Sequence, residues 1–342
     1  MRDVISERQR DFISFWLESS AMLEYKMIVH AARVLEGVTR LTPLLESELL
    51  NRRLGFRLLV KAECLQRTGS FKIRGAYVKI ASLSKKQRAA GVVAFSSGNH
   101  AQGVAAAAAE MNVPSTIIMP QDAPAVKLRN TAQYGAKVIT YDRATGDRAK
   151  IARDVAEQTG ATLIAPYDDY VLMSGQGTVA LEIVDQLAKL KTSADALVCP
   201  VGGGGLIAGI ATAMAELSPA TTVCAAEPEH FDDTRRSLIA GERVGNEPGY
   251  NSICDSIVTQ IPGEKTFPIN QKLVSLGYEA SEADVIFAMR LLADEMKIVA
   301  EPGGAAAVAA VLRHREMWSG KTVVAVVSGG NVDLSAWREF LS

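Results

Sequence analysis

The chain has 342 residues, of which 37 are lysine or arginine and 38 are aspartate or glutamate, for a formal net charge of −1 at pH 7. This balance, without long blocks of one sign, excludes a surface dedicated to nucleic acid or to an anionic membrane. No apolar run is long enough to cross a bilayer. The charged, amphipathic N-terminal segment does not resemble a secretory signal, so we expect a cytoplasmic protein.

Short β-branched runs alternate with longer, alanine-rich helical stretches along most of the chain. Such alternation, with strands that are apolar throughout, is typical of parallel sheets covered by helices on both faces. The expected strands are 57–62, 92–95, 115–119, 137–141, 196–200, 222–226 and 322–327. The expected helices lie near 101–111, 127–134, 147–159, 178–190, 206–217, 282–296 and 305–313.

A break in this pattern at residues 165–169 indicates a crossing between two lobes. Two sheets, with the chain leaving the first and later returning to it, fit the pattern better than one continuous sheet. We therefore expect an α/β protein with a large domain formed by residues 1–90 and 169–342, in which residues 1–24 are an extension. Residues 91–168 are expected to form a small mobile domain. Residues 241–271, rich in glycine, proline and asparagine, are expected to form a long irregular connection of the kind that is often functional.

Lys72 has the most informative surroundings of any residue in the chain. It follows a turn signal at Gly69 and Ser70, adjoins Phe71 and opens an apolar, helix-like run. Partly apolar surroundings disfavour the charged form of a lysine, so its amine is more often neutral and nucleophilic. A lysine that forms a Schiff base requires this property.

Four consecutive glycines, Gly202, Gly203, Gly204 and Gly205, lie between an apolar strand and a helix. Consecutive glycines let backbone N–H groups converge on an anion, and the start of a helix adds a favourable dipole. This order predicts a phosphate-binding loop, although the spacing matches neither a P-loop nor a dinucleotide fingerprint. A tight structural turn is the alternative explanation.

The segment Ser96-Ser97-Gly98-Asn99-His100 also joins an apolar strand to a helix. Its hydroxyl, amide and helix-terminal N–H groups suit a carboxylate, while a simple helix N-cap is the alternative. His100 is a candidate general base, but a lone histidine beside a helix start is better explained as a hydrogen-bonding scaffold.

A third polar segment, Ser328-Gly329-Gly330-Asn331, closes the last apolar strand. Ligands of open α/β sheets gather at the carboxyl ends of strands, so this serine is a candidate ligand-binding residue. A plain strand-to-helix turn is the competing explanation.

Seven motifs occur in the order and spacing of one enzyme family, and from about residue 25 onward the chain resembles it. They lie at 61–66, 68–72, 96–100, 175–178, 202–205, 301–302 and 328–331. The family is the threonine/serine dehydratase and serine racemase branch of the fold-type-II pyridoxal-phosphate (PLP) enzymes. The resemblance implies a two-domain fold like that of the tryptophan synthase β subunit, a cofactor-binding large domain and a homodimer.

By that resemblance, the cofactor is bound by residues of several motifs. Lys72 is expected to hold it covalently and to move the proton on the substrate Cα, and Phe71 to pack beside its ring. Asn99 is expected to bond the phenolic oxygen, and the glycines of 202–205 to hold the phosphate. Glu301 belongs to the same cofactor-binding set.

The resemblance also assigns residues to reaction choice and substrate binding. Ser328 is expected to meet the pyridine nitrogen; because a hydroxyl cannot hold that nitrogen charged, loss of a β-substituent is favoured over routes through a long-lived carbanion. Ser97 is similar to the acid/base that serine racemases use on the other cofactor face. The substrate carboxylate is expected to be bound by Ser96, Ser97, Asn99 and His100.

A segment rich in acidic residues is similar to the divalent-cation loop of this branch. Glu227, Asp233 and the carbonyl of Phe231 are expected to coordinate Mg²⁺, Mn²⁺ or Ca²⁺, because all-oxygen ligands suit a hard cation. The alternative is a solvated acidic helix start, whose carboxylates the helix dipole favours.

Two departures from the family pattern affect the expected substrate. Residues 252–256 read Ser-Ile-Cys-Asp-Ser where Thr-Ile-Ala-Asp-Gly is familiar, and residues 165–170 read Ala-Pro-Tyr-Asp-Asp-Tyr in place of His-Pro-Phe-Asp-Asp-Pro. Ser256 replaces a glycine that would lie close to cofactor and substrate, and both departures together argue against L-threonine as the natural substrate. Other members of the family serve ectoine and hydroxyectoine utilisation or act on hydroxyaspartate or phenylserine.

We therefore expect a PLP-dependent dehydratase, or ammonia-lyase, that removes water from a small 3-hydroxy amino acid and yields a 2-oxo acid and ammonia. Two alternatives remain open. One is an amino-acid racemase of the serine type that uses Lys72 and Ser97 as its two bases, and the other is a non-catalytic PLP-binding protein.

Overall fold

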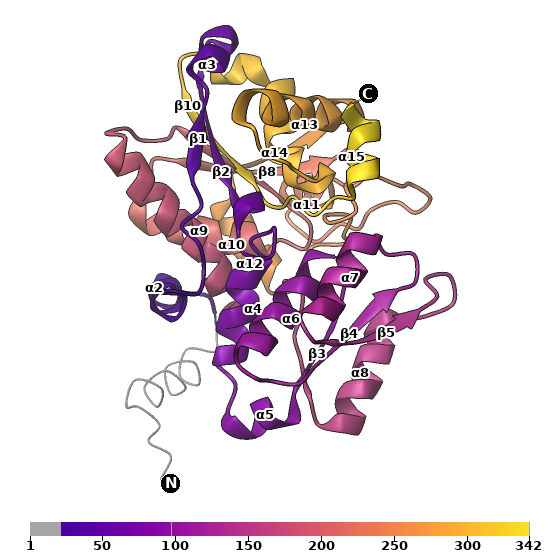
Figure 1. Ribbon diagram of the computed structural model, residues 1–342. Helices are drawn as coiled ribbons and strands as arrows, with labels where there is room; N and C mark the ends of the chain where they lie inside the picture. Colours follow the sequence, from indigo (N-terminus) through magenta and orange to yellow (C-terminus); the bar gives the residue numbers. More distant parts are fainter. Residues whose placement is uncertain (1–21, 97, 342) are drawn as a thin grey trace.

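Two mainly parallel sheets organise the computed structural model, which describes residues 22–96 and 98–341 (Figure 1). The larger sheet has the order β1-β2-β10-β7-β8-β9, in which only the β1–β2 pair is antiparallel. Its strands are β1 (Leu44–Glu46), β2 (Arg57–Ala62), β7 (Ala196–Pro200), β8 (Thr222–Pro228), β9 (Leu276–Ala280) and β10 (Thr322–Val327).

The smaller sheet has the order β5-β4-β3-β6 and is parallel throughout. Its strands are β3 (Val92–Phe95), β4 (Ser115–Pro120), β5 (Lys137–Tyr141) and β6 (Thr162–Leu163). In Figure 1 it occupies the lower part of the molecule together with α6, α7 and α8. The division into domains at residues 90 and 169, and the mobility of the smaller one, stay predictions.

The larger sheet is covered by helices on both faces, which matches the almost continuous burial of its central strands. Leu59, Leu197 and Val324 pack with α2 (Tyr25–Val34), α9 (Tyr170–Lys189) and α10 (Gly205–Leu217). Their neighbours Leu58 and Val323 pack on the opposite face with α13 (Glu282–Met296) and α14 (Pro302–Arg313).

The smaller sheet is covered in the same way. Val92 and Ile117 pack with α4 (Lys72–Ala81) and α6 (Asn99–Glu110), whereas Val93 and Ile118 pack with α8 (Arg148–Thr159). The remaining helices are α3 (Glu48–Leu54), η1 (Glu63–Leu65), α5 (Lys85–Ala90), α7 (Ala125–Gln133), α11 (Asp233–Ala240), α12 (Thr266–Leu273), η2 (Arg315–Trp318) and α15 (Leu334–Leu341). No helix in the described part of the chain is both long and apolar enough to cross a membrane.

Helix α9 begins at Tyr170, eight residues before the start expected from the sequence. The carboxylate of Asp169 caps it by accepting a hydrogen bond from the backbone N–H of Leu172 at 3.0 Å. Two glycines then lie inside the helix because neighbouring helices cross there: a Cβ on Gly175 would lie 2.7 Å from the carbonyl oxygen of Arg74, and one on Gly177 would lie 2.7 Å from that of Gly209. Glycine lowers helix propensity, so the sequence pattern hides this first part of α9.

The connection expected over residues 241–271 is shorter than predicted, because α12 begins at Thr266. The side chain of Asp168 fixes this start, accepting hydrogen bonds from the backbone N–H groups of Glu264, Lys265 and Thr266 at 3.2, 2.8 and 3.1 Å. The strands β1, β6 and β9 are also absent from the sequence prediction, the first two because they have only three and two residues.

Candidate active site

The Lys72 segment and the segment after β10 lie side by side, although they are far apart in sequence. The backbone N–H of Phe71 donates to the carbonyl of Ser328 at 3.1 Å, and that of Gly330 donates to the carbonyl of Gly69 at 2.8 Å. The two segments therefore meet at the carboxyl end of β10, where ligands of parallel sheets gather.

Lys72 is the first residue of α4, and its side chain is half-buried. Its Nζ donates a hydrogen bond to the carbonyl oxygen of Pro166 at 2.9 Å and lies 5.1 Å from the ring centre of Phe71. Burial lowers the pKa of Lys72 to about 8, although the charge of Glu301 acts in the opposite direction. The uncharged fraction of this amine near neutral pH is therefore larger than for an ordinary lysine, and the uncharged form is the state that nucleophilic attack or proton removal needs.

Asn99, the first residue of α6, joins the same centre. Its Nδ2 donates to Glu301, and its Oδ1 accepts a hydrogen bond from Nδ2 of Asn331 at 2.8 Å. Glu301 is buried, and its Oε2 forms no hydrogen bond among the described residues but an ion pair with Nζ of Lys127 at 3.4 Å. Burial raises the pKa of Glu301, while the nearby charge of Lys127 lowers it. Gly329 has no room for a side chain, because a Cβ there would collide with Oε1 of Glu301.

His100 follows Asn99 and is fully enclosed. Its Nε2 lies 3.1 Å from the carbonyl oxygen of Ile164, and its Nδ1 has no partner in the described part of the structure. Burial, and then the charge of Lys72, lower the pKa of His100 to about 3. The ring is therefore neutral at ordinary pH. Nearby, Oγ of Ser96 accepts a hydrogen bond from the backbone of Gly98 at 3.1 Å.

Ser97 lies outside the described residues. The structure thus places three of the four residues predicted to bind the substrate carboxylate, Ser96, Asn99 and His100, at the start of α6. Asn99 is linked to Lys72 through Glu301, to which it donates a hydrogen bond and whose charge acts on the lysine. His100 is linked to Lys72 directly, because the charge of the lysine lowers the pKa of the histidine. The roles of these residues stay predictions.

The four glycines form a tight loop before α10. Gly204 adopts a φ of +89°, which L-residues with side chains rarely adopt, and no side chain caps the helix behind it. A Cβ on Gly203 would collide with the ring of Tyr167, and one on Gly204 would lie 2.6 Å from Nδ2 of Asn270. The backbone N–H groups of a helix start without a side-chain cap are available to an anion.

These features fit pyridoxal phosphate. The uncapped start of α10 behind the glycine loop suits its phosphate, and the amine of Lys72 suits its aldehyde. Ser328 is buried at the end of β10, where it suits the ring nitrogen.

The residues predicted to bind a cation are brought together, but as a pair of carboxylates rather than a larger cluster. Glu227 accepts hydrogen bonds from the backbone of Thr234 and Arg235 at 2.9 and 2.8 Å, and Oδ1 of Asp233 accepts one from Asn246 at 2.8 Å. Within residues 22–96 and 98–341, no group of three or more histidines, cysteines, aspartates or glutamates is placed to hold a metal.

The electrostatics of this pair nevertheless suit a cation. Burial raises the pKa of Asp233 to about 7, and burial together with the charge of Asp233 raises the pKa of Glu227 well above its ordinary value. Oδ2 of Asp233 has no partner among the described residues. The two carboxylates offer only oxygen ligands, which suit a hard cation, and the role of the Phe231 carbonyl stays a prediction.

Lys127 on α7 is part of the site although the sequence analysis missed it. Its side chain is 2% exposed, and its Nζ lies 2.8 Å from Oδ2 of Asp255 and 3.4 Å from Oε2 of Glu301. A Cβ on Gly98 would lie 3.3 Å from the same Nζ. No local signal marks this lysine, which stands in an ordinary amphipathic helix pattern. Its partners come from distant loops.

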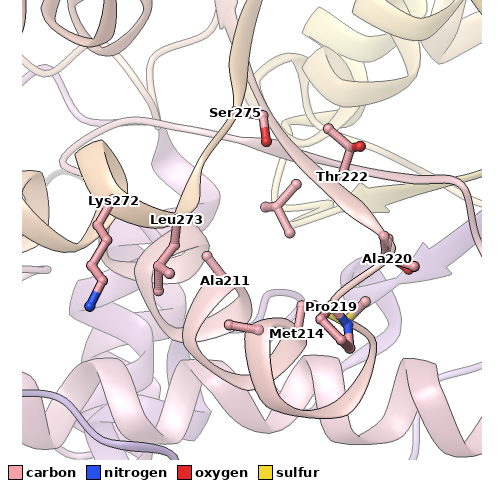
Figure 2. A pocket seen from close by; sticks show the side chains of 11 residues that line it. Ala211, Met214, Pro219, Ala220, Thr222, Lys272, Leu273 and Ser275 are labelled. Carbon is pink, nitrogen blue, oxygen red and sulfur yellow. The ribbon is translucent and has the colours of Figure 1, made fainter.

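A surface cavity of about 260 Å³ lies elsewhere, between α10, α12 and β8 (Figure 2). Ala211, Met214 and Leu273 are among the residues that line it, and none of the predicted site residues does. It is therefore separate from the centre around Lys72.

Comparison with known proteins identifies the class of protein to which this chain belongs. The model of the family "Pyridoxal-phosphate dependent enzyme" matches residues 35–329, and the chain belongs to this family. The predicted fold-type-II architecture and the predicted cofactor, pyridoxal phosphate, are confirmed.

Individual relatives lie in the predicted branch. The chain is 42% identical to an L-threo-3-hydroxyaspartate ammonia-lyase of a Pseudomonas species over 93% of this chain and 98% of the relative. It is 40% identical to a serine racemase of Arabidopsis thaliana over 88% and 91% of the two chains. A solved crystal structure of a threonine deaminase superposes with a TM-score of 0.86 at 43% identity, covering 91% of this chain and 99% of that one. The homodimer and the cytoplasmic location stay predictions.

Proposed function

We propose that this protein is an ammonia-lyase that removes water from a 3-hydroxy amino acid and releases a 2-oxo acid and ammonia. The observation that carries this proposal is the half-buried amine of Lys72, with its pKa lowered to about 8, at the end of β10 beside the start of α6. Similarity to an ammonia-lyase over almost the full length of both chains supports it.

Some residues of the site bind the substrate, and others transfer protons. Pyridoxal phosphate, when bound, supplies the electron sink for the bond broken at Cα. Lys72 in its neutral form takes the proton from Cα, and the hydroxyl on Cβ leaves as water once it has gained a proton. The start of α6, with Ser96 and Asn99, binds the substrate carboxylate. The enamine that is released becomes an imine, and water converts it into the 2-oxo acid and ammonia.

Ser328 favours elimination over competing routes. Its hydroxyl is a weaker partner for a protonated ring nitrogen than a carboxylate, so negative charge at Cα is stabilised less. A good leaving group on Cβ then departs before other reactions of Cα occur.

The substrate class can be tested directly. The purified protein, loaded with cofactor, is assayed for 2-oxo acid and ammonia with serine, threonine, 3-hydroxyaspartate, phenylserine and amino acids derived from hydroxyectoine. We expect release of both products in equal amounts from at least one of them, and 3-hydroxyaspartate is the first candidate because of the Pseudomonas relative. Bound cofactor without ammonia release from any of them would favour a non-catalytic PLP-binding protein.

Racemisation is the second candidate, because the Arabidopsis relative is a serine racemase. Chiral analysis of recovered serine separates the two reactions: a racemase produces the opposite enantiomer without loss of total amino acid, whereas an ammonia-lyase consumes it.

A further inference from the structure

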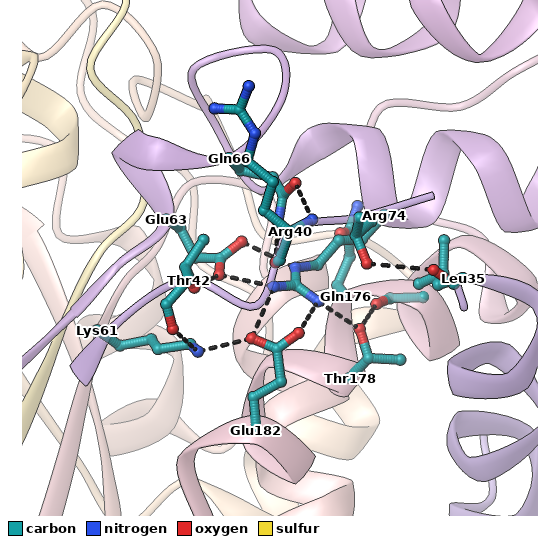
Figure 3. Close-up of polar contacts among 12 residues, drawn as sticks. Leu35, Arg40, Thr42, Lys61, Glu63, Gln66, Arg74, Gln176, Thr178 and Glu182 are labelled. Carbon is teal, nitrogen blue, oxygen red and sulfur yellow. Dashed lines mark hydrogen bonds and ion pairs between the residues drawn. The ribbon is translucent and has the colours of Figure 1, made fainter. Parts of the chain in front are cut away.

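Arg74 is the third residue of α4 and one of the most deeply buried charged residues in the described part of the protein, with 1% of its surface exposed. Its guanidinium binds two carboxylates at once (Figure 3). Nε and Nη2 donate to the two oxygens of Glu63 at 2.8 Å each, and Nη1 and Nη2 donate to the two oxygens of Glu182 at 2.6 and 3.0 Å. Nη1 also donates to Thr178 at 3.2 Å, so all five N–H groups are used.

The partners of Arg74 are held in turn. Oε1 of Glu63 accepts a hydrogen bond from Thr42 at 2.5 Å, and Oε2 of Glu182 accepts one from the buried Lys61 at 2.6 Å. Burial alone would raise the pKa of Glu63, but the charge and hydrogen bonds of Arg74 outweigh burial and hold it below its ordinary value. The network thus contains two cations and two anions and is balanced in charge.

This network connects η1 and α9 to the first turn of α4. Glu63 lies in η1 directly after β2, Glu182 lies on α9, and Arg74 lies two residues after Lys72. The Arg74–Glu63 pair therefore closes the loop 64–73 at its base. The same loop makes the backbone contacts with residues 328–330, including a bridge between Ser70 and Gly329.

Arg74 does not reach the reacting atoms itself, because residues two apart on a helix do not face the same side. A buried ion network also adds little net stability compared with apolar residues of the same volume, although it fixes geometry when every donor is satisfied. Its structural effect is therefore best sought in orientation rather than in stability.

We propose that Arg74 is a positioning residue that, by binding Glu63 and Glu182 together, fixes the first turn of α4 and so aims the amine of Lys72 at the reaction centre. This inference rests on the proposed function. The positioning role requires the planar, forked guanidinium of arginine, because the ammonium group of a lysine cannot bind both oxygens of two carboxylates.

The test compares Arg74→Lys, which keeps the charge but loses the fork, with Lys79→Met as a matched control. Lys79 lies on the same helix and pairs at 2.6 Å with Asp169, the N-cap residue of α9, so its loss also removes a cation from the contact between α4 and the start of α9. Cofactor content, visible circular dichroism per bound cofactor, kcat, KM and melting temperature are measured on each full-length holoenzyme. Visible circular dichroism reports cofactor orientation without any substrate.

We expect Arg74→Lys to lower kcat by about 10²-fold, as misplacement of a catalytic group does, with KM within twofold of the wild type and a reduced dichroic signal. Lys79→Met is expected to retain both kcat and the dichroic signal. An Arg74→Lys enzyme with unchanged kcat and signal but a lower melting temperature would overturn the proposal and leave Arg74 a purely structural residue.

A milder variant covers the case in which Arg74→Lys does not fold. Thr178→Val removes one of the five hydrogen bonds and keeps both carboxylates, so a smaller change in kcat and dichroic signal in the same direction is expected. Unchanged values in this variant would overturn the proposal. A wild-type protein that releases no ammonia from any substrate would refute the proposed function, whereas the dichroic comparison would still decide the role of Arg74.

Discussion

The amine of Lys72 donates a hydrogen bond to the backbone carbonyl oxygen of Pro166 at 2.9 Å. Pro166 lies in the segment that leads from β6 of the smaller sheet to α9 beside the larger one. A neutral carbonyl accepts a hydrogen bond from a charged or an uncharged amine, so it fixes the position of Lys72 without strongly favouring the ammonium form. The lowered pKa of Lys72 is consistent with this, since burial is its main cause.

The first prediction concerns Lys72 as the covalent anchor. Lys72→Ala is expected to lower ammonia release by more than the ~10²–10⁴-fold typical of one acid/base group, because the anchor and the base are lost together. Borohydride reduction of the wild type should attach the cofactor to the peptide that contains Lys72. The exposed Lys150 is a matched control, and its replacement by alanine should leave turnover unchanged. Attachment to any other lysine would contradict the assignment.

The second prediction concerns pH and His100. Its pKa of about 3 in the folded protein is below the ordinary value of 6.5, so the unfolded chain binds the extra proton more readily. The contribution of the neutral His100 to the free energy of unfolding is fully present above pH 6.5 and is lost as pH falls toward 3. At pH 5 the loss amounts to roughly 2 kcal/mol of unfolding free energy.

The measurement is urea unfolding of wild type and His100→Gln between pH 7 and pH 5. The variant, which does not titrate, should lose less stability over this range than the wild type. Equal losses in the two proteins would show that His100 is protonated as easily in the folded state as in the unfolded chain.

The third prediction concerns the carboxylate pair. The pKa of Asp233 is raised to about 7, so the folded protein holds this proton more tightly than the unfolded chain does. Stability from this group is therefore present at low pH and is lost as pH rises through 7. At high pH, where Asp233 has lost its proton, a divalent cation supplies the positive charge between the two carboxylates. A cation that binds only the folded state stabilises the folded state by mass action.

Saturating Mg²⁺, Mn²⁺ or Ca²⁺, added after chelation, should thus raise the melting temperature more at pH 8 than at pH 5. Asp233→Asn should remove both the shift and its pH dependence. If no cation changes the melting temperature of the wild type at pH 8, the acidic helix start is the better explanation of this segment.

The sequence predicted much of the fold because its signals are local. The seven expected strands all occur, since each is a short apolar run bounded by glycine, proline or polar residues. It failed where a distant contact decides the structure. The first part of α9 contains Gly175 and Gly177, and only their close contacts with α4 and α10 explain why glycines stand in a helix.

The same distinction applies to the site. Lys72 and the glycine loop are recognisable because neighbouring residues mark them. Lys127 and Arg74 are not marked, because their importance depends on Asp255, Glu301, Glu63 and Glu182, which folding brings to them from other segments. A cation in a helix pattern most often lies at the surface, so burial is visible only in the structure.

The last prediction concerns reaction choice and depends on Ser97 and Ser328. If Ser97 is only the proton donor on the second face, Ser97→Ala should abolish any racemisation and leave elimination measurable, because Lys72 alone can start elimination. Ser328→Asp should favour a charged ring nitrogen and stabilise negative charge at Cα, so side reactions should grow relative to ammonia release.

Chiral analysis of recovered substrate and an ammonia assay, run on the same samples, measure the two reactions in Ser97→Ala. Cofactor content is determined first for both variants, because the carboxylate of Ser328→Asp also has the size and charge to displace the ring. Ser97→Thr, which keeps a hydroxyl, serves as the control and should retain part of the racemisation. An equal loss of elimination and racemisation in Ser97→Ala, with the cofactor fully retained, would show that Ser97 is needed for both reactions and is not only the proton donor on the second cofactor face.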